Sequence, residues 1–239
     1  MPDPVFLITG ASGGIGAATA RAAARAAARA GYRVAVAGRR PGPLRELAAD
    51  LGGPARALPV CCDVCDWEQL VATVSEILGA LGRLDVVFAN AGWSAPTSFL
   101  GEDGLSPAEW HRMVATNVLG PALTARAALP ALARSGGHLL LTGSVAGRVT
   151  RPGSLYSATK WAVSALAAGI RAECVGTGVR VTLIQPGLTD AGPAGPGRQA
   201  DPRLAPADVA AAVMYAVGQP DGVDVSEIVI RPVGQDPFR

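Results

Sequence analysis

Short runs of consecutive apolar residues alternate along the chain with longer segments in which apolar positions recur at helical spacing. Val5-Phe6-Leu7-Ile8 and Leu139-Leu140-Leu141 are apolar at every position, a pattern typical of strands buried on both faces of a parallel sheet. Strand–helix alternation of this kind predicts βαβ units with right-handed crossovers. The expected fold class is therefore α/β, a doubly wound domain whose seven-stranded parallel sheet carries helices on both faces. The expected strands are Pro4–Thr9, Arg33–Ala37, Ala57–Cys62, Leu84–Asn90, Gly137–Thr142, Val179–Gln185 and Ser226–Arg231.

Three features of the sequence predict helix ends. Asp66 with Gln69, and Ser106 with Glu109, have the spacing of capping boxes, in which each side chain pairs with a free N–H of the first turn. Gly31 is expected to end the first helix in the left-handed conformation, because glycine adopts that conformation without strain.

The whole chain, residues 1–239, is expected to form one domain. Hydrophobic residues make up 49% of the sequence and charged residues 17%, which suits a large core. No composition shift or linker marks a boundary. The segment 187–206 is rich in Gly and Pro and is expected to form a lid over a substrate site, since long loops inside compact domains are usually functional.

The charge and hydropathy of the chain argue against several classes of partner. The net charge of +2 is too small to favour nucleic acid. Arg21, Arg25 and Arg29 share a helix face, which we interpret as a solvated stripe, because three charges supply little of a phosphate footprint. No apolar run approaches the roughly 20 residues that span a bilayer. The start, 1–4, lacks the basic region of a signal peptide, so a soluble, cytoplasmic protein without membrane or nucleic-acid partners is expected.

Metal binding is not expected. The spacing of the cysteines fits no paired zinc motif, and neither histidine has ligand partners in sequence. We interpret the thiols as small buried side chains in a reducing compartment. The residues concerned are Cys61, Cys62, Cys65, Cys174, His111 and His138.

A glycine-rich segment, Thr9–Gly16, joins the first expected strand to the first expected helix. Its pattern is T-G-x-x-x-G-x-G. Glycines at this point let the backbone turn tightly and approach a pyrophosphate, while the helix N-terminus supplies N–H donors. At the tip of the second strand an acidic residue would bind the ribose 2′-hydroxyl of NAD, but Gly38 stands there and is followed by Arg39 and Arg40. Since a guanidinium binds a 2′-phosphate well, we expect NADP rather than NAD.

Tyr156 and Lys160 lie four residues apart on an expected helix and therefore share one face. Free tyrosine, with a pKa of about 10, exchanges protons poorly near neutral pH. A neighbouring ammonium favours the phenolate, so Lys160 is expected to lower the pKa of Tyr156.

Together the glycine-rich loop and the Y-x-x-x-K pair resemble the short-chain dehydrogenase/reductase family, over nearly the whole chain. The resemblance implies a Rossmann-like fold and a catalytic set of Asn117, Ser144, Tyr156 and Lys160. In this set Tyr156 is the general acid or base, Lys160 assists it and binds the nicotinamide ribose, Ser144 polarises the substrate oxygen, and Asn117 holds a water in the proton relay.

The resemblance also implies cofactor contacts at the carboxyl ends of the strands. Asp63-Val64 would contact adenine, Asn90-Ala91-Gly92 would lie near the central crevice, and Pro186-Gly187 with Thr189 would contact the carboxamide side of the nicotinamide. The expected cofactor-binding residues are Gly10, Ser12, Gly14, Ile15, Gly16, Arg39, Arg40, Asp63, Val64, Asn90, Ala91, Gly92, Tyr156, Lys160, Pro186, Gly187 and Thr189.

The expected function is hydride transfer between NADP(H) and a small carbonyl or secondary alcohol substrate. The alternative is an NADP(H)-binding redox sensor or scaffold without turnover, against which the intact catalytic set argues. Arg148, Arg151 and Arg198 are candidates for binding a substrate carboxylate. The family resemblance implies a homotetramer or homodimer built through the long helices that follow the fourth and fifth strands.

Overall fold

A computed structural model describes residues 3–26, 31–101, 104–191 and 201–236 of the chain. Seven parallel strands form one sheet in the order β3-β2-β1-β4-β5-β6-β7. Every expected strand overlaps an observed one, which confirms the predicted fold class. The strands are β1 Val5–Thr9, β2 Arg33–Gly38, β3 Ala57–Cys61, β4 Val86–Ala89, β5 His138–Thr142, β6 Arg180–Pro186 and β7 Glu227–Ile230.

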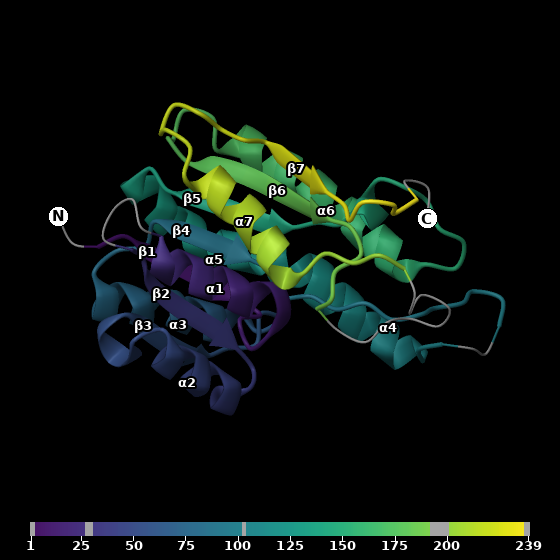
Figure 1. Cartoon of the computed structure of the whole chain (residues 1–239), viewed down its shortest axis with the longest axis horizontal. Helices are drawn as coiled ribbons and strands as arrows, with labels where there is room; N and C mark the ends of the chain where they lie inside the picture. The colour runs from purple at the N-terminus through teal and green to yellow at the C-terminus, as the bar shows by residue number, and fades with distance from the viewer. Residues whose placement is uncertain (1–2, 27–30, 102–103, 192–200, 237–239) are drawn as a thin grey trace.

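Helices cover both faces of this sheet (Figure 1). One layer holds α1, α2 and α7, and the other holds α3, α5 and α6. The helices are α1 Gly14–Arg25, α2 Pro41–Asp50, α3 Trp67–Leu81, α4 Pro107–Val114, α5 Gly120–Ser135, α6 Leu155–Glu173 and α7 Pro206–Val217. Short turns are the 3-10 turn η1 Gly53–Ala55, the π-helical turn η2 Ala115–Leu119 and the 3-10 turn η3 Val145–Gly147.

The continuous apolar runs follow from this two-sided burial. In β1, Val5 and Leu7 pack into the core beneath α3, α5 and α6, while Phe6 and Ile8 pack into the core beneath α1 and α7. Because successive side chains of a strand point to opposite faces, a strand buried on both sides is apolar at every position.

The strand order reverses at the centre of the sheet. The chain proceeds outward from β1 to β3, then returns to place β4 on the other side of β1. Ligands of open α/β sheets bind at such a reversal, outside the carboxyl ends of the strands. The strand arrowheads point toward the side of the molecule that carries α4 (Figure 1), and the predicted site residues follow those strand ends.

Two expectations about helix ends are corrected by the structure. The helix α1 ends at Arg25, and Gly31 does not have a positive φ. A β-carbon at Gly31 would lie 2.7 Å from Ala24 O, so this position requires glycine because of close backbone approach. The Asp66 side chain caps α3 by accepting the Gln69 N–H, as expected. The side-chain oxygen Oε1 of Gln69, however, accepts the N–H of Asp63 and not that of Asp66, so the expected capping box is incomplete.

The second predicted capping box is confirmed, whereas two other predicted features lie outside the residues that the structure describes. Ser106 and Glu109 form a full capping box at the start of α4, as predicted. Arg29 and 192–200, the middle of the expected lid, lie outside the described residues. At the base of that segment Asp190 N–H donates to Leu204 O at 2.8 Å. No described helix is long and apolar enough to cross a membrane.

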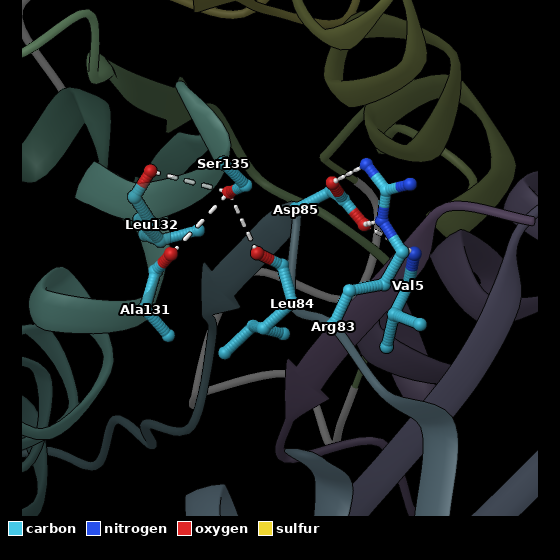
Figure 2. Close-up of polar contacts among 7 residues, drawn as sticks. All are labelled: Val5, Arg83, Leu84, Asp85, Ala131, Leu132 and Ser135. Atoms are coloured by element: carbon cyan, nitrogen blue, oxygen red, sulfur yellow. Dashed lines mark hydrogen bonds and ion pairs between the residues drawn. The ribbon is translucent and has the colours of Figure 1, made fainter. Parts of the chain in front are cut away.

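At the edge of the sheet opposite the strand carboxyl ends, polar side chains join three elements (Figure 2). Asp85 accepts hydrogen bonds from Val5 N–H at 2.8 Å and from two nitrogens of Arg83 at 2.6 and 2.8 Å. Ser135, at the end of α5, donates to Leu84 O at 2.8 Å. These contacts fix the start of β1 against β4 and the end of α5.

Asp85→Ala is expected to lower the free energy of unfolding by about 2–4 kcal/mol, because the buried Val5 N–H loses its acceptor and the Arg83 guanidinium loses its contacts with this carboxylate. Urea unfolding followed by circular dichroism measures the change. Asp3→Ala is the matched control, since the Asp3–Arg56 pair is exposed and 3.5 Å long; it should change stability little. Equal effects of the two substitutions would contradict the assignment.

Candidate active site

The phosphate loop between β1 and α1 depends on glycine at two close approaches. Gly10 has φ +66°, and a β-carbon there would lie 2.8 Å from Ala91 Cα. At Gly16 a β-carbon would lie 2.5 Å from Gly10 O. Larger residues at either position would separate the loop from the end of β4 or from its own first turn.

The N-terminus of α1 is open toward this loop. The helix has no side-chain cap and no acidic residue in its first turn, and a β-carbon at Gly13 would meet no other atom within 4 Å. Gly14 has φ +52°, and the carbonyl of Ile15 accepts the Thr19 hydroxyl at 2.8 Å. Free N–H groups at a helix N-terminus bind anions, so the loop is suited to a phosphate.

Two arginines follow the tip of β2, and both are exposed. The Arg40 guanidinium donates to Ser12 Oγ of the phosphate loop at 3.3 Å. Arg39 lies toward β3, where its carbonyl accepts the Cys61 thiol at 3.7 Å. The structure thus places the Arg40 guanidinium on the glycine-rich loop and the backbone of Arg39 beside the end of β3.

After β3, Asp63 and Val64 have different surroundings. The Asp63 carboxylate accepts the Cys65 N–H at 3.0 Å and remains partly exposed. Val64 is buried, and a β-carbon at Gly120 would approach its Cγ2 to 2.8 Å. Val64 therefore packs against the start of α5, and the Asp63 carboxylate bonds the backbone of the turn that follows β3.

The ends of β1, β4 and β5 are joined by hydrogen bonds. Thr9 Oγ1 accepts from Asn90 N–H at 3.0 Å and from Ala91 N–H at 3.2 Å. Asn90 Nδ2 donates to Thr9 O at 3.1 Å, and Thr142 Oγ1 donates to Asn90 Oδ1 at 3.2 Å. These hydrogen bonds hold the ends of β1, β4 and β5 together at the point where the strand order reverses.

Tyr156 and Lys160 project from the first turns of α6. Ser154 caps this helix by accepting Ser157 N–H at 3.1 Å. Lys160 is 4% exposed, and its Nζ donates to Thr142 O at 2.7 Å. The same Nζ lies 5.6 Å from the centre of the Tyr156 ring. The predicted pair is thus brought together, with the ammonium over the ring.

The pKa of Tyr156 does not follow the expectation from sequence. Burial raises it, and a hydrogen bond with Ser144 and the charge of Arg151 oppose that effect. Burial lowers the pKa of Lys160 to about 8. The expected lowering of the Tyr156 pKa is wrong for the protein alone, because loss of water around the phenol outweighs the nearby charges.

Asn117 lies in the π-helical turn η2 between α4 and α5. Its side-chain amide donates to Trp93 O at 2.8 Å and to Thr159 Oγ1 at 3.2 Å, and its carbonyl accepts Trp93 N–H at 3.0 Å. The side chain therefore ties the segment after β4 to α6. Its role in a water relay stays a prediction.

Ser144 follows β5 and faces the end of β6. Its hydroxyl accepts Ala146 N–H at 3.1 Å and donates to Pro186 O over a long 3.4 Å. Gly187 N–H donates to Ile230 O at 2.7 Å, and Thr189 Oγ1 donates to Gly187 O at 3.1 Å. The four predicted catalytic residues and the segment after β6 thus meet at the same edge of the sheet.

A family model described as short chain dehydrogenase matches residues 4–201. The chain belongs to this family. An uncharacterised oxidoreductase of Staphylococcus aureus strain USA300 is 35% identical over 237 residues, 98% of this chain and 99% of the relative. Among solved structures, an alcohol dehydrogenase from the archaeon Thermococcus sibiricus, complexed with 5-hydroxy-NADP, has a TM-score of 0.84 and 34% identity and covers 98% of both chains. Serine dehydrogenase from Escherichia coli has a TM-score of 0.84 and 29% identity, covering 97% of this chain and 99% of that one.

The residues of this short chain dehydrogenase fit a nicotinamide dinucleotide. The uncapped N-terminus of α1 offers donors for the phosphates. At Gly92 a β-carbon would lie 3.2 Å from Asn117 Oδ1 and 3.7 Å from Lys160 Nζ. A side chain there would crowd both of these groups.

Sequence reasoning missed several residues that hold this site together. The backbone carbonyl of Thr142 accepts a hydrogen bond from Lys160 Nζ. The Thr159 hydroxyl and the Trp93 backbone form hydrogen bonds with the side chain of Asn117. Backbone partners carry no signal in a single sequence. The sequence suggests Arg151 only as a partner for a substrate carboxylate, whereas in the structure its charge also lowers the pKa of Tyr156.

The prediction of buried thiols is confirmed for Cys62 and Cys174, but Cys61 is exposed and Cys65 is half-buried. His138 is buried at the start of β5, its Nε2 lies 2.8 Å from Thr182 Oγ1, and burial lowers its pKa to about 3. Across the described ranges, no group of His, Cys, Asp and Glu that would suit a metal ion is found.

Proposed function

We propose that this short chain dehydrogenase transfers a hydride between NADP(H) and a carbonyl or secondary alcohol substrate. The observation that carries the proposal is the placement of Tyr156 and Lys160 on one face of α6, beside Ser144 at the end of β5. The alcohol dehydrogenase activity named for the Thermococcus relative supports it. Tyr156 would be the acid that this reaction requires, with Ser144 and Lys160 as its partners, so the proposal rests on the site and not on the fold alone.

The protein's own residues would transfer the proton to or from the substrate oxygen and stabilise the negative charge that develops on the phenol oxygen. When bound, the nicotinamide supplies or accepts the hydride. The Tyr156 phenol donates a proton to the substrate oxygen in reduction and takes it back in oxidation. Ser144 Oγ donates to the same oxygen, since its present bond to Pro186 O is long and easily exchanged. Lys160 stabilises negative charge as it develops on the phenol oxygen.

Arg39 and Arg40 are proposed to select NADP(H) over NAD(H). The contact of the Arg40 guanidinium with Ser12 of the glycine-rich loop supports this proposal. Binding of 5-hydroxy-NADP by the Thermococcus relative agrees with this choice. A guanidinium pairs with phosphate through two parallel hydrogen bonds.

Arg40→Ala is expected to weaken NADPH binding by about 10- to 100-fold, the loss of a charge-assisted hydrogen bond. The Kd for NADH should not change, since NADH lacks the phosphate. Arg39→Ala should weaken NADPH selectively as well. Titration with each nicotinamide, followed by its fluorescence, measures these Kd values.

Arg45→Ala is the matched control, because Arg45 is an exposed arginine of α2, five residues beyond Arg40 in the sequence. Equal affinity of the wild type for NADH and NADPH would refute the cofactor choice. Binding of neither nucleotide would refute the proposed function itself.

A second copy of the chain is proposed as a partner, in a homodimer or homotetramer. An apolar groove of about 450 Å³ lies between α5 and α6, lined by residues such as Ala122, Leu129, Leu166 and Ile170. These are the helices that follow β4 and β5, and their small side chains suit close helix packing.

A further inference from the structure

Thr97, in the loop between β4 and α4, contacts the turn that precedes the proposed catalytic tyrosine. Its Oγ1 accepts a hydrogen bond from Leu155 N–H at 2.9 Å and donates one to Gly153 O. Leu155 is the first residue of α6 and stands immediately before Tyr156. A side chain 58 residues upstream thus holds the start of the catalytic helix.

The first turn of a helix needs acceptors from outside, because its N–H groups have no partner within the helix. In α6, Ser154 accepts Ser157 N–H, and Thr97 accepts Leu155 N–H. Gly153 has φ +68°, and a β-carbon there would lie 3.0 Å from Thr97 O. The two segments are therefore in close backbone contact, and the Thr97 hydroxyl links both sides of the turn.

The segment that carries Thr97 is itself fixed on both sides. Trp93 forms two backbone hydrogen bonds with the side chain of Asn117, at 2.8 and 3.0 Å. Leu105 N–H donates to Pro96 O at 3.2 Å, which closes the loop on the other side of Thr97. A restrained segment is able to position what it contacts, whereas a mobile one is not.

We propose that Thr97 is a positioning residue for the reaction, whose hydroxyl fixes the first turn of α6 and thereby the phenol oxygen of Tyr156. The inference rests on the proposed function for its effect on rate. Proton transfer requires the phenol within hydrogen-bond reach of the substrate oxygen, so a small displacement of this turn lowers kcat. The Thr97 hydroxyl bonds Gly153 and Leu155, whereas the cofactor phosphates are proposed to bind at the N-terminus of α1, so we expect cofactor affinity to change little.

The test compares Thr97→Val, which keeps the shape but loses the hydroxyl, with Thr97→Ser, which keeps the hydroxyl. Thr97→Val is expected to lower kcat about tenfold, within the range for misplaced catalytic groups, without changing the KM for NADPH. Thr97→Ser should retain nearly the wild-type kcat. Ser98→Ala is the control, because the Ser98 hydroxyl, as far as the described residues show, bonds within its own loop, where it accepts the Gly101 N–H.

Hydrogen–deuterium exchange of the protein without ligands provides a readout independent of turnover. The amides of 155–158 should exchange faster in Thr97→Val than in the wild type or Thr97→Ser. Unchanged exchange and unchanged kcat in Thr97→Val overturn the proposal, as does equal impairment of both variants. If the wild type reduces no ketone, the proposed function fails, and the exchange rates alone decide whether Thr97 positions this turn.

Discussion

Tyr156→Phe is expected to lower kcat for ketone reduction by about 10²- to 10⁴-fold, the usual contribution of a positioned general acid. The substitution keeps the ring that lies under the Lys160 ammonium and removes only the phenol oxygen. The Kd for NADPH should therefore remain that of the wild type. Steady-state kinetics with a ketone panel, together with nicotinamide fluorescence titration, measure both quantities.

The neighbouring Ser157 supplies a matched control. Within the described part of the chain its hydroxyl is buried and has no hydrogen-bond partner, so Ser157→Ala removes an oxygen from the same turn without breaking a contact. It should leave kcat unchanged. A Tyr156→Phe enzyme with more than a tenth of wild-type kcat would assign the proton to another group.

The raised pKa of Tyr156 also fixes the direction of the pH dependence. Reduction needs the neutral phenol, which burial favours, so the reduction rate should be level through neutral pH and fall only in alkali. Oxidation needs the phenolate and should accelerate as the pH rises.

Lys160→Met is expected to reduce activity by at least about 10²-fold and at the same time to stabilise the protein without ligands near pH 7. Burial lowers the pKa of Lys160 from 10.5 to about 8, which corresponds to about 3 kcal/mol of destabilisation. Loss of the bond to Thr142 O removes about 1 kcal/mol of the expected gain. Urea unfolding at several pH values measures the balance.

The sign of this effect follows from the two protonation states. Below about pH 8 the folded protein holds a buried charge, and the full penalty is present. Between about pH 8 and 10.5 the unfolded chain binds more protons than the folded one, so wild-type stability rises with pH. The advantage of Lys160→Met should therefore shrink over that interval. An advantage that grows with pH would contradict the assigned pKa shift.

The strands of the sheet could be predicted from the sequence, because a strand buried on both faces is a continuous run of apolar residues. The apolar run in β1 and the glycines of Thr9–Gly16 indicate a buried strand and a close backbone approach without any knowledge of the partners. The phosphate loop and the Tyr156–Lys160 spacing are likewise local. These features depend on chain neighbours only, so a single sequence contains them.

What the sequence could not provide depends on distant contacts. Thr97 was not identified, because its partner Leu155 is brought near only by the fold. The pKa of Tyr156 was assigned the wrong direction, because a nearby lysine is visible in the sequence whereas burial is not. Gly31 was interpreted as a helix cap, but its need for glycine comes from the carbonyl of Ala24.

Lys160 is the only lysine in the sequence, and it is 4% exposed. Amine-directed reagents therefore have two targets, the chain's α-amino group and a side chain inside the site. Selective nitrogen-15 labelling of lysine would give a single side-chain resonance, whose titration reports the site directly. Acylating reagents would reach that side chain only when the structure around α6 opens locally, so the rate of acylation would measure how often this local opening occurs.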